Sequence, residues 1–224
     1  REEKLMPIDI VNSEVQAFLN QKYKPLDEEM EDFRRIGEND NVPIILRETE
    51  ELLATLLKLK KPKKILEIGT AIGYSACFFA KFCEKAEIYT IENDEFAYTA
   101  AIRNIKKAGV DNRVHTYFGD GEEQIEKIRD QGINGFDFVF IDASKSNYKR
   151  FMESSIEVSD SGAVIVSDNI LIHGLTVFEK LDPKKKHRTH RKKMREYIDF
   201  IKHDKRLSTT LMALGDGVAV SILR

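Results

Sequence analysis

The stretch ILEIGTAIGYSA, residues 65–76, passes from a short apolar run through a glycine-containing turn into the start of a helical pattern. Ile65–Ile68 has the length and composition of a buried strand, and Gly69 and Gly73 mark the turn that follows it. A strand that leads through a tight turn into a helix is the repeating unit of a sheet of parallel strands. We therefore expect an α/β fold that extends outward from this stretch.

The alternation of strand and helix continues toward the C-terminus. Further strand-like runs lie at residues 88–91, 114–118, 136–141 and 163–167, with helical patterns near 74–84, 94–108, 120–130 and 147–157. After a helix near 189–203, strands at 209–214 and 217–222 follow each other directly. This order predicts a Rossmann-like, seven-stranded mixed sheet flanked by helices, in which parallel strands are closed by a C-terminal antiparallel hairpin.

Length and composition indicate a single structural unit. The 224 residues are 42% hydrophobic and 33% charged, which is typical of a globular domain. Helical spacing dominates the first part, so we expect an N-terminal helical extension (residues 1–60) that packs on an α/β core domain (residues 61–224). No apolar run has the length of a membrane span or the form of a signal peptide, and neither cysteine has zinc or disulfide spacing. We expect a cytoplasmic protein without membrane contacts.

Charge is distributed unevenly along the chain. The 36 Lys and Arg residues nearly balance the 38 Asp and Glu residues, which gives a formal net charge of −2. Residues 180–195, the basic segment, contain nine basic residues and one acid, Asp182. A basic segment on an otherwise acidic chain favours an anionic partner, and a solvated helix face is the simpler alternative.

Ligands of parallel sheets bind beyond the carboxyl ends of the strands, so the residues at those ends are candidates for a site. Gly69 and Gly73 have G-x-x-x-G spacing, unlike the G-x-G-x-x-G that accommodates a pyrophosphate, and Glu67 can face a cationic group. Glu92 can accept both hydroxyls of a ribose, and Asp120 can accept from an adenine amino group. Each has an ordinary alternative as a turn or cap residue. Together they favour a nucleoside-bearing ligand without phosphate, such as S-adenosylmethionine.

A second set of polar residues follows two strands that should be neighbours in the sheet. Asp142 ends the fourth predicted strand, and Asp168 and Asn169 end the fifth. Two carboxylates and an amide oxygen suit Mg²⁺, with Ca²⁺ or Mn²⁺ possible, and the alternative is that the acids cap the following helices. Lys145, three residues after Asp142, is then the candidate general base, and the alternative is a solvated surface lysine.

From about Val42 to the C-terminus the chain resembles the metal-dependent, catechol-type O-methyltransferases of the class I fold. The motifs that carry the resemblance are ILEIGTAIGYSA (65–76), IYTIEND (88–94), GDG (119–121), FIDASKSNY (140–148), SDNILIHG (167–174) and LGDGVAVS (214–221). The resemblance implies that Asp142, Asp168 and Asn169 hold Mg²⁺ and that Lys145 deprotonates the acceptor hydroxyl. It implies S-adenosylmethionine contacts for Ile45, Glu67, Gly69, Ser75, Glu92, Asp120, Gly121 and Asp142.

The resemblance leaves the acceptor open. Ala143-Ser144 follow the first metal ligand, where small-molecule catechol enzymes often have His-Trp, and the whole-chain pattern is most similar to the bacterial tRNA 5-hydroxyuridine O-methyltransferases. That similarity implies methylation of the wobble base to 5-methoxyuridine, with phosphate contacts from the basic segment. Tyr148 and Phe178 could stack on the base or pack in the core.

Two other functions compete with tRNA methylation. One is a small-molecule catechol or caffeoyl-type O-methyltransferase, and the other is a non-catalytic RNA-binding protein on the same fold. The family also implies a homodimer through the N-terminal helices.

Overall fold

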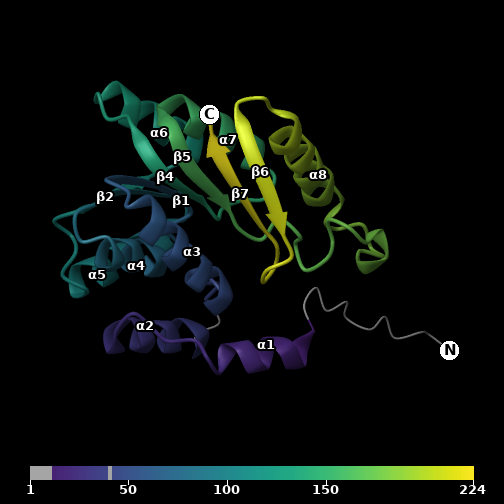
Figure 1. The fold of residues 1–224 in the computed structure, drawn as a ribbon, viewed down its shortest axis with the longest axis horizontal. Helices are drawn as coiled ribbons and strands as arrows, with labels where there is room; N and C mark the ends of the chain where they lie inside the picture. Colours follow the sequence, from purple (N-terminus) through teal and green to yellow (C-terminus); the bar gives the residue numbers. More distant parts are fainter. Residues whose placement is uncertain (1–11, 40–41) are drawn as a thin grey trace.

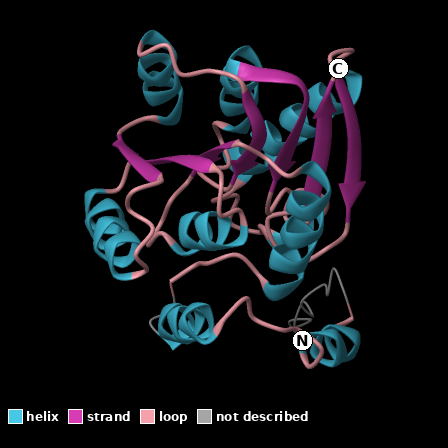
Figure 2. Cartoon of the chain, turned by 60° about the vertical axis from the view of Figure 1, so that its left-hand side comes forward, coloured by secondary structure: helices cyan, strands magenta, loops and turns pink. Residues whose placement is uncertain are grey.

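The computed structural model describes residues 12–39 and 42–224 and has one central sheet with helices on both faces (Figure 1, Figure 2). The helices are α1 (Ser13–Asn20), α2 (Glu28–Asn39), α3 (Arg47–Lys60), α4 (Tyr74–Phe82), α5 (Glu95–Lys107), α6 (Gly121–Asp130), α7 (Tyr148–Val158) and α8 (Arg188–His203), with a short 3-10 turn η1 (Glu179–Leu181). The strands are β1 (Lys64–Ile68), β2 (Glu87–Glu92), β3 (Val114–Phe118), β4 (Phe136–Ile141), β5 (Ser159–Ser167), β6 (Leu207–Met212) and β7 (Val218–Leu223).

The sheet has seven strands in the order β3-β2-β1-β4-β5-β7-β6. Strands β1 to β5 are parallel, and β7 lies antiparallel between β5 and β6. The predicted mixed sheet is therefore confirmed. Because β1 lies between β2 and β4, and β4 between β1 and β5, the carboxyl ends of the four strands that carry the candidate site residues are adjacent.

Alternation along the strands divides the apolar residues between two cores, one on each face of the sheet. Leu66, Val139 and Ile141 point to the side covered by α6, α7 and α8. Ile65 and Phe140 point to the opposite side, which α3, α4 and α5 cover (Figure 1). The strands are hydrophobic on both sides because helices cover both faces, as expected for a parallel sheet.

Two strands, β6 and β5, have a boundary that differs from the sequence prediction by more than one residue. Strand β6 runs over Leu207–Met212 instead of 209–214, because Met212 pairs with Val218 and the residues between them form the turn. Strand β5 begins at Ser159, four residues earlier than predicted. Its polar start, Ser159–Gly162, lacks the hydrophobic signal by which the rest of the strand is recognised.

The N-terminal helices contact the core domain to different extents. Met30 of α2 and Leu53 and Leu57 of α3 are buried in the same cluster as Ile65 of β1, whereas α1 has no buried residue. Residues 1–11 of the predicted extension lie outside the described residues. No helix in the described ranges combines the length and the apolar character that a bilayer span requires.

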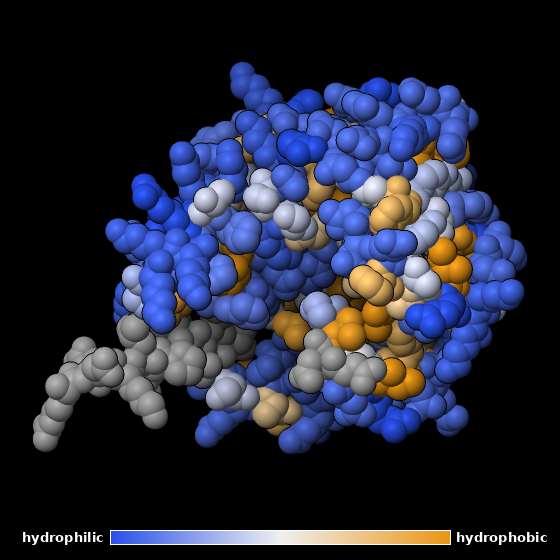
Figure 3. Space-filling view, turned by 180° about the vertical axis from the view of Figure 1, so that it is seen from behind, coloured by the Kyte–Doolittle hydropathy of each residue, from blue (hydrophilic) through white to orange (hydrophobic). Residues whose placement is uncertain are grey.

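The face of the molecule drawn in Figure 3 is mostly hydrophilic, with apolar side chains gathered toward one side.

Candidate active site

Two adjoining cavities lie at the carboxyl ends of the parallel strands. The larger, here the main cavity, has a volume of about 470 Å³, and the smaller, the side cavity, about 120 Å³. Predicted site residues that line the main cavity are Ile45, Gly69, Ser75, Asp142, Lys145, Asp168 and Asn169. Those that line the side cavity are Gly69, Glu92, Gly121 and Asp142. Glu67 and Asp120 line neither cavity.

The turn after β1 brings the backbone close to β4. Gly69 has a φ of +104°, and a Cβ atom at this position would lie 1.9 Å from the carbonyl oxygen of Asp142. Only glycine fits so close an approach in this backbone conformation. The turn therefore adjoins Asp142 at the point where both cavities meet.

Glu92, at the end of β2, has a fixed carboxylate. One oxygen accepts the amide N–H of Ala71 at 2.8 Å, and the other accepts the amide N–H groups of Asn93 and Asp94 at 2.8 and 2.9 Å. The residue that caps α5 is Asp94, which accepts the N–H of Ala97. Glu92 is therefore not the helix cap, and its carboxylate faces the side cavity beside the turn after β1.

Asp120 has local partners in the structure. It is the N-cap of α6, where its Oδ1 accepts the amide N–H of Glu122 at 3.1 Å, and it pairs with Arg150 at 3.1 Å. Since it lines neither cavity, its contact with an adenine amino group stays a prediction. The next residue, Gly121, lines the side cavity, and a Cβ there would lie 2.7 Å from the ring of Phe151.

Glu67 is completely buried in β1 beneath the turn. Burial raises the pKa of its carboxyl group to about 7, and hydrogen bonds from Ser75 and Thr90 partly oppose that increase. Its Oε1 atom has no hydrogen-bond partner. Glu67 is thus a buried polar group below the cavity floor rather than part of the lining.

Lys145 joins the residues predicted to hold the metal. Its Nζ donates to Oδ1 of Asp142 at 2.9 Å, to Oδ1 of Asn169 at 3.2 Å and to the hydroxyl of Tyr148 at 2.7 Å. The side chain of Lys145 is 21% exposed, so it is not a freely solvated surface lysine. The Tyr148 hydroxyl donates onward to the backbone carbonyl of Asp168 at 2.8 Å.

Asp168 is 1% exposed at the end of β5. Burial raises the pKa of its carboxyl group above the usual range, and the nearby Asp142 carboxylate adds to this increase. Its Oδ1 accepts the amide N–H of Asn169, whereas Oδ2 is buried without a partner. Within the described residues, no three His, Cys, Asp or Glu side chains cluster to hold a metal, so a site here requires the Asn169 amide oxygen.

For Tyr148 the sequence leaves base stacking and core packing open, and the structure shows core packing: the residue is completely buried, and its hydroxyl accepts from Lys145, a contact that the sequence does not predict. A second contributor to the cavity is not predicted at all. Asp216, in the turn between β6 and β7, lines the main cavity and accepts the amide N–H of His173 at 2.6 Å. Burial raises the pKa of the Asp216 carboxyl. In the sequence Gly215-Asp216-Gly217 signals only a hairpin turn, and nothing local indicates that this turn meets the loop after β5.

The basic segment is used partly within the fold. Arg191 is 7% exposed and pairs with Glu179, and Arg195 donates to the carbonyl oxygens of Thr176 and Val177. Lys184, Lys185 and Lys186 are exposed and precede α8. Arg195 thus connects α8 to the loop after β5, here the cavity loop, of which Asn169, Ile172 and His173 line the main cavity.

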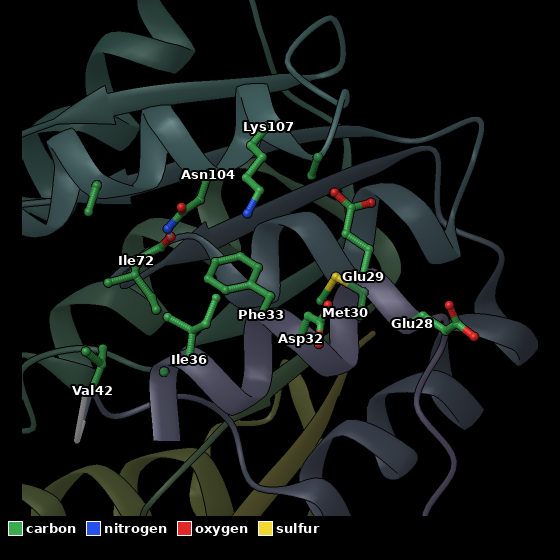
Figure 4. Close-up of a pocket in the computed structure, with 13 residues that line it drawn as sticks. Glu28, Glu29, Met30, Asp32, Phe33, Ile36, Val42, Ile72, Asn104 and Lys107 are labelled. Carbon is green, nitrogen blue, oxygen red and sulfur yellow. Dashed lines mark hydrogen bonds between the residues drawn. The ribbon is translucent and has the colours of Figure 1, made fainter. Parts of the chain in front are cut away.

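Another cavity, of about 650 Å³, lies between α2 and α5 (Figure 4). Phe33, Ile36 and Ile72 form apolar parts of its wall, while Glu29 and Lys107 supply charge. It contains none of the predicted site residues and shares no lining residue with the main cavity. The chemistry-bearing side chains are therefore concentrated in the main and side cavities.

Residues 22–223 match a family model described as O-methyltransferase. The chain belongs to this family. It is therefore an O-methyltransferase, and the alternative of a non-catalytic RNA-binding protein is wrong.

Individual relatives agree with this assignment. The chain is similar to the caffeoyl-CoA O-methyltransferase of Populus kitakamiensis, with 31% identity over 171 residues, 75% of this chain and 73% of that protein. It is 32% identical over 130 residues to the catechol O-methyltransferase of Niastella koreensis, covering 58% of this chain and 59% of that protein.

Solved structures share the fold. A Staphylococcus aureus protein provisionally described as a caffeoyl-CoA O-methyltransferase has a TM-score of 0.85 and 30% identity, covering 94% of this chain and 98% of that chain. A Bacillus cereus O-methyltransferase solved in complex with SAH has a TM-score of 0.81 and 24% identity, covering 94% and 97%. The Rossmann-like methyltransferase fold expected from the sequence is confirmed.

Proposed function

We propose that this enzyme methylates one of two vicinal oxygens on a small acceptor of the catechol or caffeoyl type, with the help of a divalent cation. The observation that carries the proposal is the position of the Lys145 nitrogen, which lies within 3.2 Å of side-chain oxygens of both Asp142 and Asn169 at the cavity wall. The two side-chain oxygens can bind a cation, and the lysine nitrogen beside them can act as a base.

The residues present fit a hard cation. Asp142, Asp168 and Asn169 would hold Mg²⁺ through oxygen atoms only, the ligands that Mg²⁺ prefers. The unpartnered Oδ2 of Asp168 supports this, because a buried carboxylate oxygen is costly unless it is paired. Bound there, Mg²⁺ would act as a Lewis acid and lower the pKa of the acceptor hydroxyl.

Lys145 supplies the base in this proposal. Its partial exposure allows Nζ to release one proton to solvent, and the neutral amine then takes the hydroxyl proton of the acceptor. The Tyr148 hydroxyl accepts a hydrogen bond from this nitrogen and donates one to the Asp168 carbonyl, so it holds the nitrogen in place. Correct orientation of acceptor and methyl donor can contribute about 7–11 kcal/mol of the barrier reduction.

S-adenosylmethionine would occupy the two adjoining cavities. The Glu92 carboxylate, fixed by three backbone N–H groups, faces the side cavity and suits the ribose hydroxyls. Gly69 allows the backbone to approach the ligand closely, and Ile45 and Ser75 line the main cavity nearby. This arrangement leaves the end with Lys145 and Asp216 for the acceptor.

The relatives favour a small acceptor. Those named after a substrate act, by their names, on caffeoyl-CoA or catechol, and both substrates present two neighbouring aromatic oxygens. Such a pair can chelate one cation, which matches the oxygen ligands described above. We therefore prefer this class to the polynucleotide acceptor that the sequence pattern suggested.

The basic segment supports methylation of 5-hydroxyuridine in tRNA to 5-methoxyuridine as a second candidate. The 5-hydroxyl and 4-carbonyl of that base are also vicinal oxygens, so the same chemistry would apply. Exposed Lys184–Lys186 precede the helix that Arg195 connects to the cavity loop, and lysines in such a place suit phosphate contacts.

A paired assay tests the proposal. The enzyme is incubated with S-adenosylmethionine and Mg²⁺ together with a catechol or caffeoyl-CoA in one arm, and with hydroxyuridine-containing tRNA in the other. Mass analysis of methylated catechol or feruloyl product supports the small-acceptor function. Formation of 5-methoxyuridine without any small-molecule product would overturn it in favour of the second candidate. As a control, Asp168→Ala is expected to lose Mg²⁺-dependent activity and still bind the cofactor.

A further inference from the structure

A buried ion pair connects the N-terminal helices to a wall of the main cavity. Arg34 on α2 and Glu50 on α3 are 1% and 3% exposed, and Nη2 of Arg34 lies 2.6 Å from Oε2 of Glu50. The other terminal nitrogen of Arg34 donates to the carbonyl oxygen of Ile45 at 2.9 Å. Because Ile45 lines the main cavity, the guanidinium holds one part of that wall directly.

The Glu50 carboxylate connects the same pair to a second part of the wall. Oε2 also accepts the hydroxyl of Tyr74 at 2.7 Å, and Oε1 accepts the hydroxyl of Tyr23. Tyr74 begins α4 directly after the glycine turn and lines the main cavity. The Arg34 guanidinium lies 4.7 Å from the ring centre of Tyr74 and 5.5 Å from that of Tyr23.

Stability alone is a weak reason for such an arrangement. Removing two charges from water costs about as much as their attraction returns, so a buried ion pair adds little net stability compared with apolar side chains of similar size. What it does provide is direction, since a guanidinium that donates to two different acceptors and a carboxylate that accepts from several donors fix the groups around them. Here both ends of the network fix residues of the cavity wall, Ile45 and Tyr74.

We propose that Arg34, Glu50 and Tyr23 are positioning residues that hold the Ile45 and Tyr74 wall and thereby set the affinity of the enzyme for S-adenosylmethionine. The inference rests on the proposed placement of the cofactor in the main and side cavities. It assigns a function to the N-terminal helices, which contribute no catalytic group among the residues described.

The test is the KM for S-adenosylmethionine in Arg34→Lys, in which one ammonium cannot bind both Glu50 and the Ile45 carbonyl in the same way. KM is expected to rise about tenfold, the effect of removing one charge-assisted hydrogen bond, while kcat stays within about twofold. Tyr23→Phe should raise KM by a smaller factor. The control is Arg35→Lys on the same helix, whose side chain is 65% exposed and pairs with Asp32.

KM separates positioning from a purely structural role, because it does not depend on the fraction of enzyme that is folded. A variant with a lower melting temperature and an unchanged KM would overturn the inference. If single variants fail to fold, Arg34→Met/Glu50→Met removes both charges at once, and a raised KM is again expected.

Glu92→Ala distinguishes the two proposals. If Glu92→Ala raises KM for S-adenosylmethionine and Arg34→Lys does not, the cofactor placement stands and the positioning role is refuted. If Glu92→Ala leaves KM unchanged, the cofactor placement itself fails, and the positioning role fails with it.

Discussion

The Tyr148 hydroxyl lies between the proposed base and the carbonyl of a proposed metal ligand. It accepts from Lys145 at 2.7 Å and donates to the Asp168 carbonyl at 2.8 Å. In Tyr148→Phe the Lys145 nitrogen loses a partner that fixes its position, so we expect kcat to fall about tenfold. The affinity for S-adenosylmethionine, measured by calorimetry, should stay unchanged.

Tyr197→Phe is the matched control for that variant. Tyr197 is equally buried and packs edge-on against Tyr148, but its hydroxyl pairs with Ser167 and not with Lys145. Its kcat should remain close to that of the unchanged enzyme. Equal losses in both variants would show that packing around α7, and not the bond to Lys145, is responsible.

Glu67 gives the stability of the enzyme a dependence on pH. Burial raises the pKa of its carboxyl to about 7 from the ordinary value of 4.5. Between these two values the folded state binds more protons than the unfolded state, so stability falls as pH rises through this range. In Glu67→Gln this fall should be reduced by at most about 3 kcal/mol between pH 4.5 and 8.

Denaturant unfolding of both proteins at several pH values tests this prediction. At pH 4.5 the carboxyl is mostly neutral in the folded state, and the Gln variant should be close in stability to the unchanged enzyme. At pH 8 the variant should have the larger free energy of unfolding, because only the unchanged enzyme then has a buried charged carboxylate. A parallel pH dependence in both proteins would contradict the raised pKa of Glu67.

The sequence predicts best which residues lie together where polar side chains follow the end of a strand. Asp142, Lys145, Asp168 and Asn169 were predicted together because adjacent parallel strands bring their carboxyl ends together. Asp216 was missed because it reaches the cavity from an antiparallel hairpin, whose approach to the loop after β5 is a tertiary contact. No local periodicity indicates such a contact.

At the scale of elements, the turn between β1 and α4 tolerates no side chain at its first glycine. In Gly69→Ala the new Cβ would meet the Asp142 carbonyl at 1.9 Å, and the backbone at this position has a φ of +104°. We expect a loss of stability of about 3 kcal/mol or more, together with loss of cofactor binding. Thermal unfolding with and without S-adenosylmethionine measures both effects.

Gly109→Ala separates steric conflict from the general effect of glycine replacement. Gly109 also has a positive φ, +65°, but a Cβ added there would have no atom within 4 Å. This variant should lose only about 1–2 kcal/mol and keep its cofactor affinity. If both variants lose the same stability, the close approach of the two backbone segments at Gly69 is not what requires glycine.

The strands themselves were predictable to the extent that they are apolar. Phe136–Ile141 was placed correctly because its hydrophobic residues coincide with its pairing to β1 and β5. The polar beginning of β5 was missed, since Ser159 is recruited by pairing with Phe136 and not by its own propensity. The hydrophobic pattern therefore predicts that a segment is a strand, whereas pairing with neighbouring strands decides where the strand begins and ends.

At the scale of the whole molecule, the net charge of −2 does not show that the residues of the basic segment have different roles. Some bind other parts of the fold, and others are exposed. Sequence alone treated its nine basic residues as one surface, whereas Arg191 and Arg195 are bound to Glu179 and to backbone carbonyls. Those two arginines anchor α8 beside the cavity loop. The exposed residues without such contacts, Lys184–Lys186 and Arg188 among them, are the better candidates for binding phosphates in the tRNA function.

Replacing Lys184, Lys185 and Lys186 by Gln is therefore the informative change, because it removes three charges without breaking the contacts of Arg191 or Arg195. If the second candidate function holds, tRNA binding should weaken, and the slope of log affinity against log salt should fall by about one for each phosphate that is no longer neutralised. Filter binding at several salt concentrations measures that slope.

The control replaces Lys58, Lys61 and Lys85, which line a different cavity away from the proposed active site. A general attraction between tRNA and positive charge would lower both slopes equally, whereas a docking surface at the cavity mouth would lower only the first. Unchanged slopes in both variants would show that Lys184–Lys186 do not contact the phosphates of tRNA.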